Sequence, residues 1–445
     1  MSANELEEDS PLTITLWDFS WYVRTGPGEP FEDLDRAFTE AARRGYNTVR
    51  ICAMPFLVFG SGLDTSRLEL GPLGGGYGQR VRWYDVAGTT VIDARASLLA
   101  LLQAAKGHDF RVIVSSWEYQ QSPAFATSSS WSDALMAVDP EMRAERLADS
   151  LADLVDFART NAVADTIAFV ELHNEVQIGH LTDGLGVGLS LDERVVALKP
   201  RLNRGIARFK QRHADVPVTV NYSGVPIGQF RGVPDDIDVF VVHPYVYGVL
   251  DAFTDRFGLR RPVDGFDQDA AAEAFLLPDA PLAADWLPSQ IEPWKAIATI
   301  IQPAEVYAHD WGDANKIDRW LYDHYGEYRI AMAQKLTMWL EAAADFAAQR
   351  NIPVVFGEGW VGYTPLEGNF EEGPVGAEFC RLAAREAARV GAWGSIVCSN
   401  AAPQHPMWRD VALQLECNAI FTESYTATHT ATPRSAPVQV SERTS

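Results

Sequence analysis

The chain has 445 residues, enough for one large decorated domain or for two or three smaller ones. Its 60 acidic and 37 basic residues give a net charge of −23. This charge argues against nucleic-acid binding, which needs a basic surface, and against docking on anionic lipid; it favours a neutral small-molecule partner. Hydrophobic residues make up 47% of the chain, so it can bury a large core without disulfides.

The first eleven residues, MSANELEEDSP, have neither the basic nor the apolar region of a signal peptide. No apolar run approaches the roughly 18 residues of a membrane span. The four cysteines form no CxxC pair. We therefore expect a cytoplasmic protein with free thiols and no membrane partner.

Short β-branched runs alternate with amphipathic segments along most of the chain. The runs predict strands at residues 12–19, 46–53, 110–117, 166–175, 217–224, 237–247, 353–360 and 394–400. The amphipathic segments predict helices at residues 31–44, 93–107, 140–160, 191–213, 328–350, 375–390 and 408–421.

The predicted strands are continuous apolar runs, which is typical of a parallel sheet buried on both faces. Eight strands separated mostly by helices predict a (β/α)8 TIM barrel. The alternative is a doubly wound open sheet. The turn after the first strand, residues 17–21, lacks the GxGxxG pattern that such a sheet carries when it binds a dinucleotide.

We expect a single barrel domain over residues 12–421. Residues 1–11 are a predicted N-terminal tail, and the Thr/Ser/Pro-rich residues 422–445 predict a disordered C-terminal tail. Two long insertions, near residues 54–90 and 248–326, follow the second and sixth strands. In a barrel, both would lie on the face that carries active sites.

Chemically distinctive residues stand at the predicted strand ends. Asn174 and Glu175 close the fourth strand, and Glu358 closes the seventh. Arg50 lies on the second strand, and His243 begins the HPY sequence near the end of the sixth. Active sites of TIM barrels are built from these ends.

This arrangement resembles the retaining glycoside hydrolases of clan A, the cellulase-like superfamily. In that clan an Asn-Glu pair closes strand four and a second Glu closes strand seven. The resemblance covers roughly residues 12–421. It implies that Glu175 is the acid/base, that Glu358 is the nucleophile, and that Asn174 binds the sugar 2-hydroxyl. It also implies that Arg50 lies beside the nucleophile, and that the histidine/aromatic pair His243 and Tyr245 contacts it.

Two strand ends depart from the pattern of the clan. A histidine often stands near the end of strand three, where this chain has Trp117–Glu118, and a tryptophan often closes strand eight, where it has Ser399–Asn400. The resemblance is therefore to the clan and not to one of its families, and the sugar specificity stays open.

Glycoside cleavage needs two carboxyl groups beside one bond, one protonated and one ionised. The neighbours of Glu175, Asn174 and an apolar valine, favour desolvation and a raised pKa. Glu358 lies between two glycines, where a ligand can approach closely. Glu371 and Glu372 are interpreted as ordinary acids before a helix.

Several residues have a structural interpretation beside the functional one. Glu118 is a substrate ligand or a structural acid, Arg50 could form a buried ion pair only, and His243 could be a core histidine. Trp17, Trp117 and Trp360 stand where sugar rings could stack, or they pack the core. Asp18 and Asn400 are further candidate substrate contacts at strand ends.

The nine histidines form no HxH, HxxxH or HExxH motif, and the chain has no P-loop and no GxSxG. We therefore expect no metal and no cofactor. The long insertions favour a walled pocket and exo cleavage of small oligosaccharides or glycosides. The alternatives are an inactive sugar-binding barrel and a transglycosidase that uses the same carboxylates. The oligomeric state is not determined by the sequence.

Overall fold

The computed structural model describes residues 10–362 and 364–431. Its main sheet has nine strand segments, all paired in parallel, in the order β7-β6-β5-β2-β1-β11-β10-β9-β8. The segments are β1 (Leu12–Asp18), β2 (Thr48–Cys52), β5 (Arg111–Ser115), β6 (Ile167–Glu171), β7 (Val218–Thr219), β8 (Asn221–Ser223), β9 (Phe240–His243), β10 (Val354–Phe356) and β11 (Gly394–Ile396).

The sheet closes into a barrel at β7 and β8. These two segments are separated by Val220 alone, so they are two halves of one strand. β7 pairs with β6, and β8 pairs with β9. The ring therefore has eight strand positions and no free edge, which confirms the predicted (β/α)8 barrel and excludes the open sheet.

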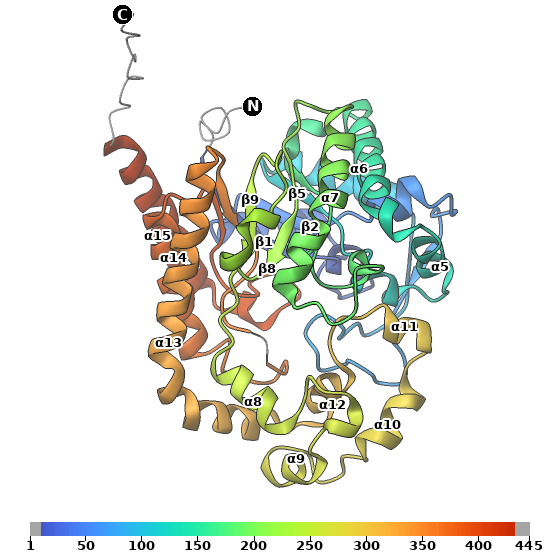
Figure 1. Ribbon diagram of the computed structural model, residues 1–445, viewed down its shortest axis with the longest axis vertical. Helices are drawn as coiled ribbons and strands as arrows, with labels where there is room; N and C mark the ends of the chain where they lie inside the picture. Colours follow the sequence, from blue (N-terminus) through green and yellow to red (C-terminus); the bar gives the residue numbers. More distant parts are fainter. Residues whose placement is uncertain (1–9, 363, 432–445) are drawn as a thin grey trace, which may run out of the picture.

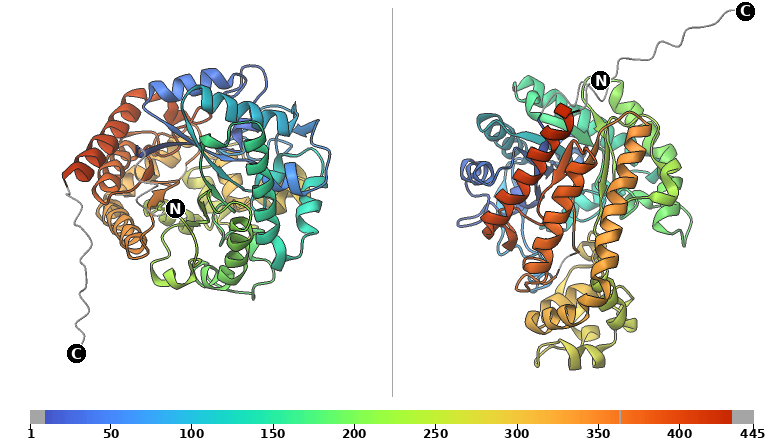
Figure 2. Two further views of the ribbon diagram at one scale, coloured as in Figure 1. Left: turned by 90° about the horizontal axis from the view of Figure 1, so that it is seen from above. Right: turned by 90° about the vertical axis from the view of Figure 1, so that its left-hand side faces the viewer.

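Helices surround the barrel, as the view along its axis shows (Figure 2). They are α3 (Leu34–Arg43), α4 (Ala94–Gly107), α6 (Arg143–Thr160), α7 (Leu191–Lys210), α13 (Ala314–Gln349), α14 (Pro374–Arg389) and α15 (Val411–Ala431). Side chains cap several of their first turns; Asp33, Asp93, Ser190 and Asp313 accept backbone N–H bonds. Among the helices of the described residues, none has the length and apolar character that a membrane span requires.

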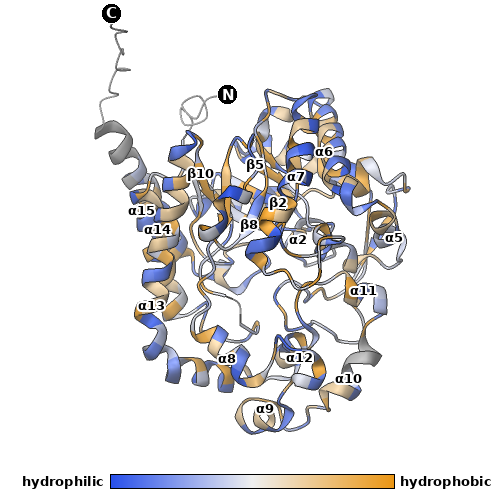
Figure 3. Cartoon of the chain, in the orientation of Figure 1, coloured by the Kyte–Doolittle hydropathy of each residue, from blue (hydrophilic) through white to orange (hydrophobic). Residues whose placement is uncertain are grey.

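Hydrophobic residues are frequent in the strands, whereas the surrounding helices mix hydrophobic and hydrophilic residues (Figure 3). A cluster of buried side chains fills the amino-terminal part of the barrel interior: Leu12, Ile14, Ile113, Phe169, Val239, Val241, Val355 and Trp393. Because strand residues alternate between two faces, positions two or four residues further along each strand also point inward. Those positions include Asp18, Glu171 and His243, so polar side chains occupy the carboxyl-terminal end of the barrel.

Two long segments lie at this carboxyl-terminal end. Residues 54–90 contain η1 (Phe56–Gly60) and β3 (Leu68–Leu70), which pairs with β4 (Thr90–Ile92). Residues 248–313 form a lobe below the barrel (Figure 1 and Figure 2, right). The helices of the lobe are α8 (Val249–Phe257), α9 (Gln268–Ala274), α10 (Ala283–Gln290), α11 (Pro293–Ile297) and α12 (Pro303–Trp311).

The remaining elements are short. They are α2 (Ser20–Val23), α5 (Ser130–Met136), η2 (Ser122–Phe125), η3 (Pro140–Met142), η4 (Ala164–Thr166), η5 (His180–Thr182), η6 (Ile227–Gly232), η7 (Val263–Gly265) and η8 (Pro406–Arg409).

Two helices extend beyond the residues expected from the sequence. α13 begins at Ala314 instead of residue 328, because Asp313 caps it and its first turns bury Ile317 and Leu321. α15 continues to Ala431, ten residues into the segment expected to be a disordered tail, where the buried Tyr425 ring lies 6.3 Å from that of Phe421. Residues 1–9 and 432–445 of the two predicted tails lie outside the described residues.

Candidate active site

Arg50 organises the carboxyl-terminal end of the barrel. Its guanidinium donates to Glu171 Oε2 at 2.7 and 3.0 Å, to Glu358 Oε1 at 2.8 Å and to Asn174 Oδ1 at 2.7 Å. Its other contact is the Trp117 ring, whose centroid lies 4.6 Å from Cζ. A guanidinium presents five donors in one plane, so this single side chain holds two buried carboxylates and one amide in fixed positions.

Asn174 and Glu175 lie just beyond β6, in a turn held by hydrogen bonds. The backbone of Glu175 has φ 43°, a left-handed conformation that costs a non-glycine residue about 1–3 kcal/mol. Its N–H donates to Asn221 Oδ1 at 2.6 Å, and Asn221 Nδ2 donates to Glu171 Oε2 at 2.9 Å. Asn174 Nδ2 donates to Gln120 Oε1 at 3.0 Å. These bonds stabilise the conformation that turns Glu175 toward the barrel axis.

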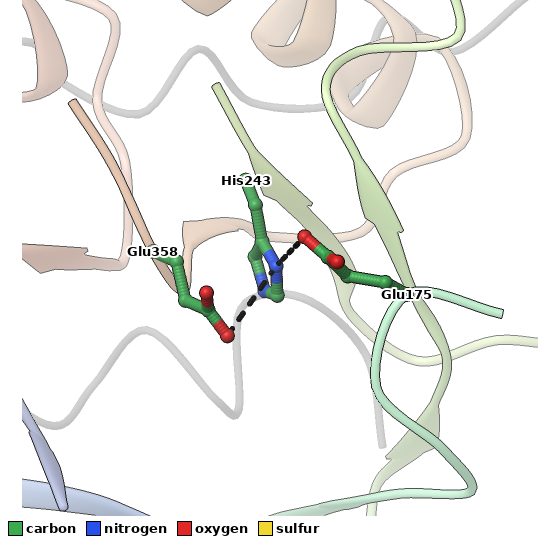
Figure 4. A group of neighbouring side chains, drawn as sticks. All are labelled: Glu175, His243 and Glu358. Carbon is green, nitrogen blue, oxygen red and sulfur yellow. Dashed lines mark hydrogen bonds and ion pairs between the residues drawn. The ribbon is translucent and has the colours of Figure 1, made fainter. Parts of the chain in front are cut away.

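Glu175 and Glu358 face each other across His243 (Figure 4). His243 Nδ1 lies 3.0 Å from Glu175 Oε1 and 3.5 Å from Glu358 Oε1. One oxygen of each carboxylate and one nitrogen of the histidine lie within 4.8 Å of one another. The barrel has therefore brought together two carboxyl groups that are far apart in the sequence.

The surroundings of the two glutamates differ in charge. Burial, and then the neighbouring Glu358 carboxylate, raise the pKa of Glu175 to about 8. Burial also raises the pKa of Glu358, but the Arg50 guanidinium and the Tyr245 hydroxyl, which donates at 3.2 Å, stabilise its ionised form. These surroundings favour the proton on Glu175 and the negative charge on Glu358.

His243 is neutral in this setting. Burial, and then the positive charge of Arg50, lower its pKa well below the usual value. Its Nε2 has no hydrogen-bond partner among the described residues and faces Gly357, where a β-carbon would lie 3.0 Å away. The ring therefore fills the space between the two acids without adding a charge.

Within residues 10–362 and 364–431, Glu175, His243 and Glu358 are also a group whose donor atoms are close enough together to hold a metal ion. The Arg50 guanidinium already occupies Glu358 Oε1 at 2.8 Å. A second cation at this point would face that positive charge at close range. The donor set therefore fits a proton-transfer site better than a metal centre.

The two glutamates open into a cavity of about 390 Å³. Its walls come from the barrel ends, from residues 54–90 and from the lobe. The lining residues are Leu16, Asp18, Trp83, Trp117, Gln121, Asn174, Glu175, Ile178, Leu191, Ser223, Tyr245, Tyr247, Arg260, Ile300, Ile301, Gln302, Glu305 and Glu358.

Asp18 and Trp117 line this cavity, as expected from their strand positions. Asp18 accepts a hydrogen bond from Ser20 N–H at 2.6 Å and one from Gln404 Nε2 at 3.4 Å. Burial outweighs these bonds and raises the pKa of Asp18 to about 7. A carboxyl group in this position can hydrogen-bond a ligand hydroxyl.

The contacts of Glu118 fit a structural acid better than a substrate ligand. Its carboxylate accepts the backbone N–H groups of Phe56 and Leu57 at 3.0 and 2.7 Å and the Ser116 hydroxyl at 3.0 Å. It therefore anchors the start of η1 and does not line the cavity.

Trp17, Trp360 and Asn400 do not line the cavity either, so the structure does not support the prediction that they contact substrate. The Trp17 ring is fully buried against two phenylalanines, because this residue follows the inward-facing Leu16 and so points toward the helices. Trp360 is fully buried beside Phe356. Asn400 donates to Glu371 in a separate buried cluster.

That cluster corrects the interpretation of Glu371 as an ordinary acid before a helix. Glu371 is fully buried and forms an ion pair with Arg82 at 2.9 Å, and Arg82 also pairs with Glu372. Burial raises the pKa of Glu371 to about 8. The cluster ties residues 54–90 to the segment after β10, behind the cavity wall.

Sequence reasoning missed Glu171 and the residues that the lobe contributes to the cavity. The two-residue alternation that places Phe169 inside the barrel also places Glu171 there, and this is the signal that could have found it. Arg260 and Glu305 come from the lobe, whose placement over the barrel no local pattern encodes.

The fold and the site define a (β/α)8-barrel protein with a pair of buried glutamates at the carboxyl ends of its strands. Residues 14–128 match the model of a family described as cellulase-like, "Sugar-binding cellulase-like". This match confirms the resemblance to the cellulase-like superfamily. The matched segment contains Asp18, Arg50 and Trp117 and ends before either glutamate.

Solved structures provide the second comparison. A candidate glycoside hydrolase from Parabacteroides distasonis ATCC 8503 is 21% identical, with 93% of this chain and 94% of that chain covered and a TM-score of 0.67. An endo-1,4-β-D-mannanase from Thermotoga petrophila RKU-1 is 12% identical, with 87% of each chain covered and a TM-score of 0.44. A glycoside hydrolase family 5 enzyme from Prevotella bryantii B14 is 13% identical, with 96% and 98% covered and a TM-score of 0.45. The first of these likenesses shows the barrel fold. Among curated proteins, the sequence comparison found no match.

Proposed function

We propose that the protein is a retaining glycoside hydrolase in which Glu175 is the acid/base and Glu358 is the nucleophile. The observation that carries the proposal is the separation of the two carboxyl groups, which have oxygens within 4.8 Å of each other. Retaining enzymes hold their two carboxyl groups about 5–5.5 Å apart, whereas inverting enzymes need about 6.5–9.5 Å to admit a water molecule.

The first step transfers the proton of Glu175 to the glycosidic oxygen while Glu358 attacks the anomeric carbon. The carbon–oxygen bond to the leaving group breaks, and a glycosyl ester forms on Glu358. In the second step Glu175, now ionised, removes a proton from water; the resulting hydroxyl displaces Glu358 from the anomeric carbon. The pair gives up one proton to the leaving group in the first step and regains one from water in the second, so the cycle needs one protonated and one ionised carboxyl group at its start.

The surrounding residues support both roles. The charge of Arg50 and the hydroxyl of Tyr245 favour Glu358 as a carboxylate leaving group and nucleophile. Asn174 has a second amide N–H beyond the one given to Gln120, and this donor can bind the sugar 2-hydroxyl. Asp18 can accept from another sugar hydroxyl.

Exo cleavage is supported by the contacts that wall in the cavity. The Asp310 carboxylate of the lobe accepts the backbone N–H groups of Gly78 and Arg80 at 2.6 and 2.9 Å. Lys295 Nζ donates to the Pro72 carbonyl at 3.1 Å. The lobe and residues 54–90 are thus joined across one side of the site, which favours a pocket over an open cleft for a long polymer.

The test is hydrolysis of a panel of aryl pyranosides and furanosides by the wild type, Glu175→Gln and Glu358→Gln. Glu358→Gln is expected to lose all turnover. Glu175→Gln is expected to lose hydrolysis of alkyl glycosides far more than the initial release of dinitrophenolate, which leaves without a proton. Glu367→Gln, which replaces an exposed acid that pairs with Arg80 and does not line the cavity, is the matched control.

Binding without any turnover would favour the alternative of an inactive sugar-binding barrel. Products longer than the substrate at high sugar concentration would favour a transglycosidase.

A further inference from the structure

The cavity has two halves of different polarity. At its floor, the side chains of Asp18, Asn174, Glu175, Tyr245 and Glu358 present carboxyl, amide and hydroxyl groups, and all five residues are buried. This half suits a sugar ring, which offers a hydroxyl on nearly every carbon. The other half, which opens toward solvent, is lined by apolar side chains.

Apolar side chains from three separate segments line the outer half. Ile178 and Leu191 come from the segment between β6 and α7 and from the start of α7, Trp83 comes from residues 54–90, and Ile300 and Ile301 come from the lobe. Leu191 is 47% exposed, and Trp83, Ile178 and Ile300 are partly exposed. Ile301 is buried, but the other four apolar side chains converge from three segments and remain partly open to solvent, which indicates a binding surface.

This apolar half adjoins the proposed acid. Ile178 N–H donates to the Glu175 carbonyl at 2.8 Å, so the isoleucine belongs to the same turn as the acid. The acid of a glycosidase gives its proton to the leaving group. The space beside Glu175 and away from Glu358 is therefore the space that the leaving group occupies.

Several of the polar groups near this space have partners within the protein. The Ser223 side chain lowers the pKa of Glu175 and so favours its ionised form, and Gln121 Oε1 accepts from the Tyr84 hydroxyl at 2.8 Å. Arg260 donates to Asp251 at 2.8 Å and lies 3.9 Å from Glu305, so its charge is balanced.

Gln302 is the exposed amide of the same wall. A buried hydroxyl without a hydrogen bond is costly. To bury its hydroxyl groups here, a second sugar would have to displace the protein partners of Gln121 and Arg260.

The outer half is also held in place before a ligand arrives. His180 lies between β6 and α7, and its Nε2 is 3.0 Å from the Ile297 carbonyl at the end of α11. This contact joins the segment that carries Ile178 to the segment that carries Ile300. The apolar walls are therefore spaced by the fold.

From this asymmetry we infer that the substrate is a glycoside whose leaving group is an apolar alkyl or aryl alcohol, and not a second sugar. The inference rests on the proposed function, because the position of the leaving group follows from Glu175 being the acid. Independently of turnover, the cavity should bind a sugar at its floor and an apolar tail toward solvent.

Binding is measured by calorimetry in the Glu358→Gln protein, with the methyl and hexyl forms of β-D-glucopyranoside and of β-D-mannopyranoside as probes. Each methylene that becomes fully buried increases the binding affinity roughly fourfold. Because the tail stays partly solvated, we expect the hexyl form to bind about tenfold more tightly than the methyl form for at least one sugar. Ile300→Ser is expected to reduce this ratio by about threefold or more. Ile297→Ser is the matched control, since Ile297 is 58% exposed in the same segment and does not line the cavity.

The inference would be overturned if the methyl and hexyl forms bind with equal affinity for both sugars. It would also be overturned if none of the four probes binds. An equal effect of Ile300→Ser and Ile297→Ser would overturn it as well. Hydrolysis by the wild type is followed separately. A chain-length preference without turnover would leave the inference standing while the proposed function fails, and turnover without a preference would do the reverse.

Discussion

Replacement of Arg50 by methionine removes the cation that holds the site together. The variant keeps most of the side-chain volume but leaves Glu171 and Glu358 buried without their partner. Removing one member of a buried ion pair costs about 3–5 kcal/mol. Because Arg50 is fully buried and bonds two carboxylates and Asn174, we expect a loss of free energy of unfolding in the upper part of that range.

The loss should depend on pH. Without Arg50, burial raises the pKa of Glu358 further. A carboxyl group whose folded-state pKa exceeds its unfolded-state pKa destabilises the protein at high pH, and this effect disappears as pH falls and the group is protonated. The difference in stability between the variant and the wild type should therefore be larger at pH 8 than at pH 5.

The assay is urea unfolding of both proteins at the two pH values. The matched control is Arg381→Met, because Arg381 forms two 2.8 Å contacts with Glu416 at the surface, where an ion pair contributes at most about 1 kcal/mol. Equal losses in the two variants, or a loss for Arg50→Met that does not change with pH, would refute the reasoning. If Arg50→Met does not fold, Arg50→Gln, which also removes the charge but keeps hydrogen-bond donors for the two acids, tests the same pH dependence.

Three further predictions concern single groups. The rate kcat/KM should fall above pH 8 as Glu175, whose pKa is about 8, loses its proton; an unchanged alkaline limb in Glu175→Gln would contradict this assignment. Gly357→Ala places a β-carbon 3.0 Å from His243 Nε2 and should lower kcat/KM about tenfold or more by displacing the ring, whereas Gly88→Ala, with no atom within 4 Å of its β-carbon, should leave it unchanged. Glu118→Gln should lower the free energy of unfolding by about 1–2 kcal/mol without changing KM, because it weakens the anchor of η1; a selective rise in KM would instead indicate substrate contact.

The barrel could be predicted from the sequence because each strand is a continuous apolar run and each is followed by an amphipathic segment. The two catalytic candidates could be predicted for a related reason. Glu175 and Glu358 interrupt or follow apolar runs, where an acid without a function is unfavourable. Both were found at strand ends, and the fold brings them together.

The direction in which individual side chains point at the strand ends was harder to predict. Trp17 and Asp18 are neighbours in the sequence, yet one packs against the helices and the other lines the cavity. A shift of one residue in strand register exchanges the two faces, and the ends of strands are the positions where register is least certain.

The outer half of the cavity could not be predicted at all. Ile178, Trp83 and Ile300 lie in three loop segments that meet only after folding. No local periodicity connects them, because long-range packing and contacts such as that between His180 and Ile297 determine their positions.

The central claim is double displacement by Glu175 and Glu358, and the configuration of the first-formed sugar tests it most directly. Proton NMR during hydrolysis of a reactive aryl glycoside distinguishes the two anomers before they interconvert. The proposed mechanism predicts that the first sugar released has the same anomeric configuration as the substrate. Release of the opposite anomer would contradict it, because it would require water to act directly between carboxyl groups that lie too close together to hold it.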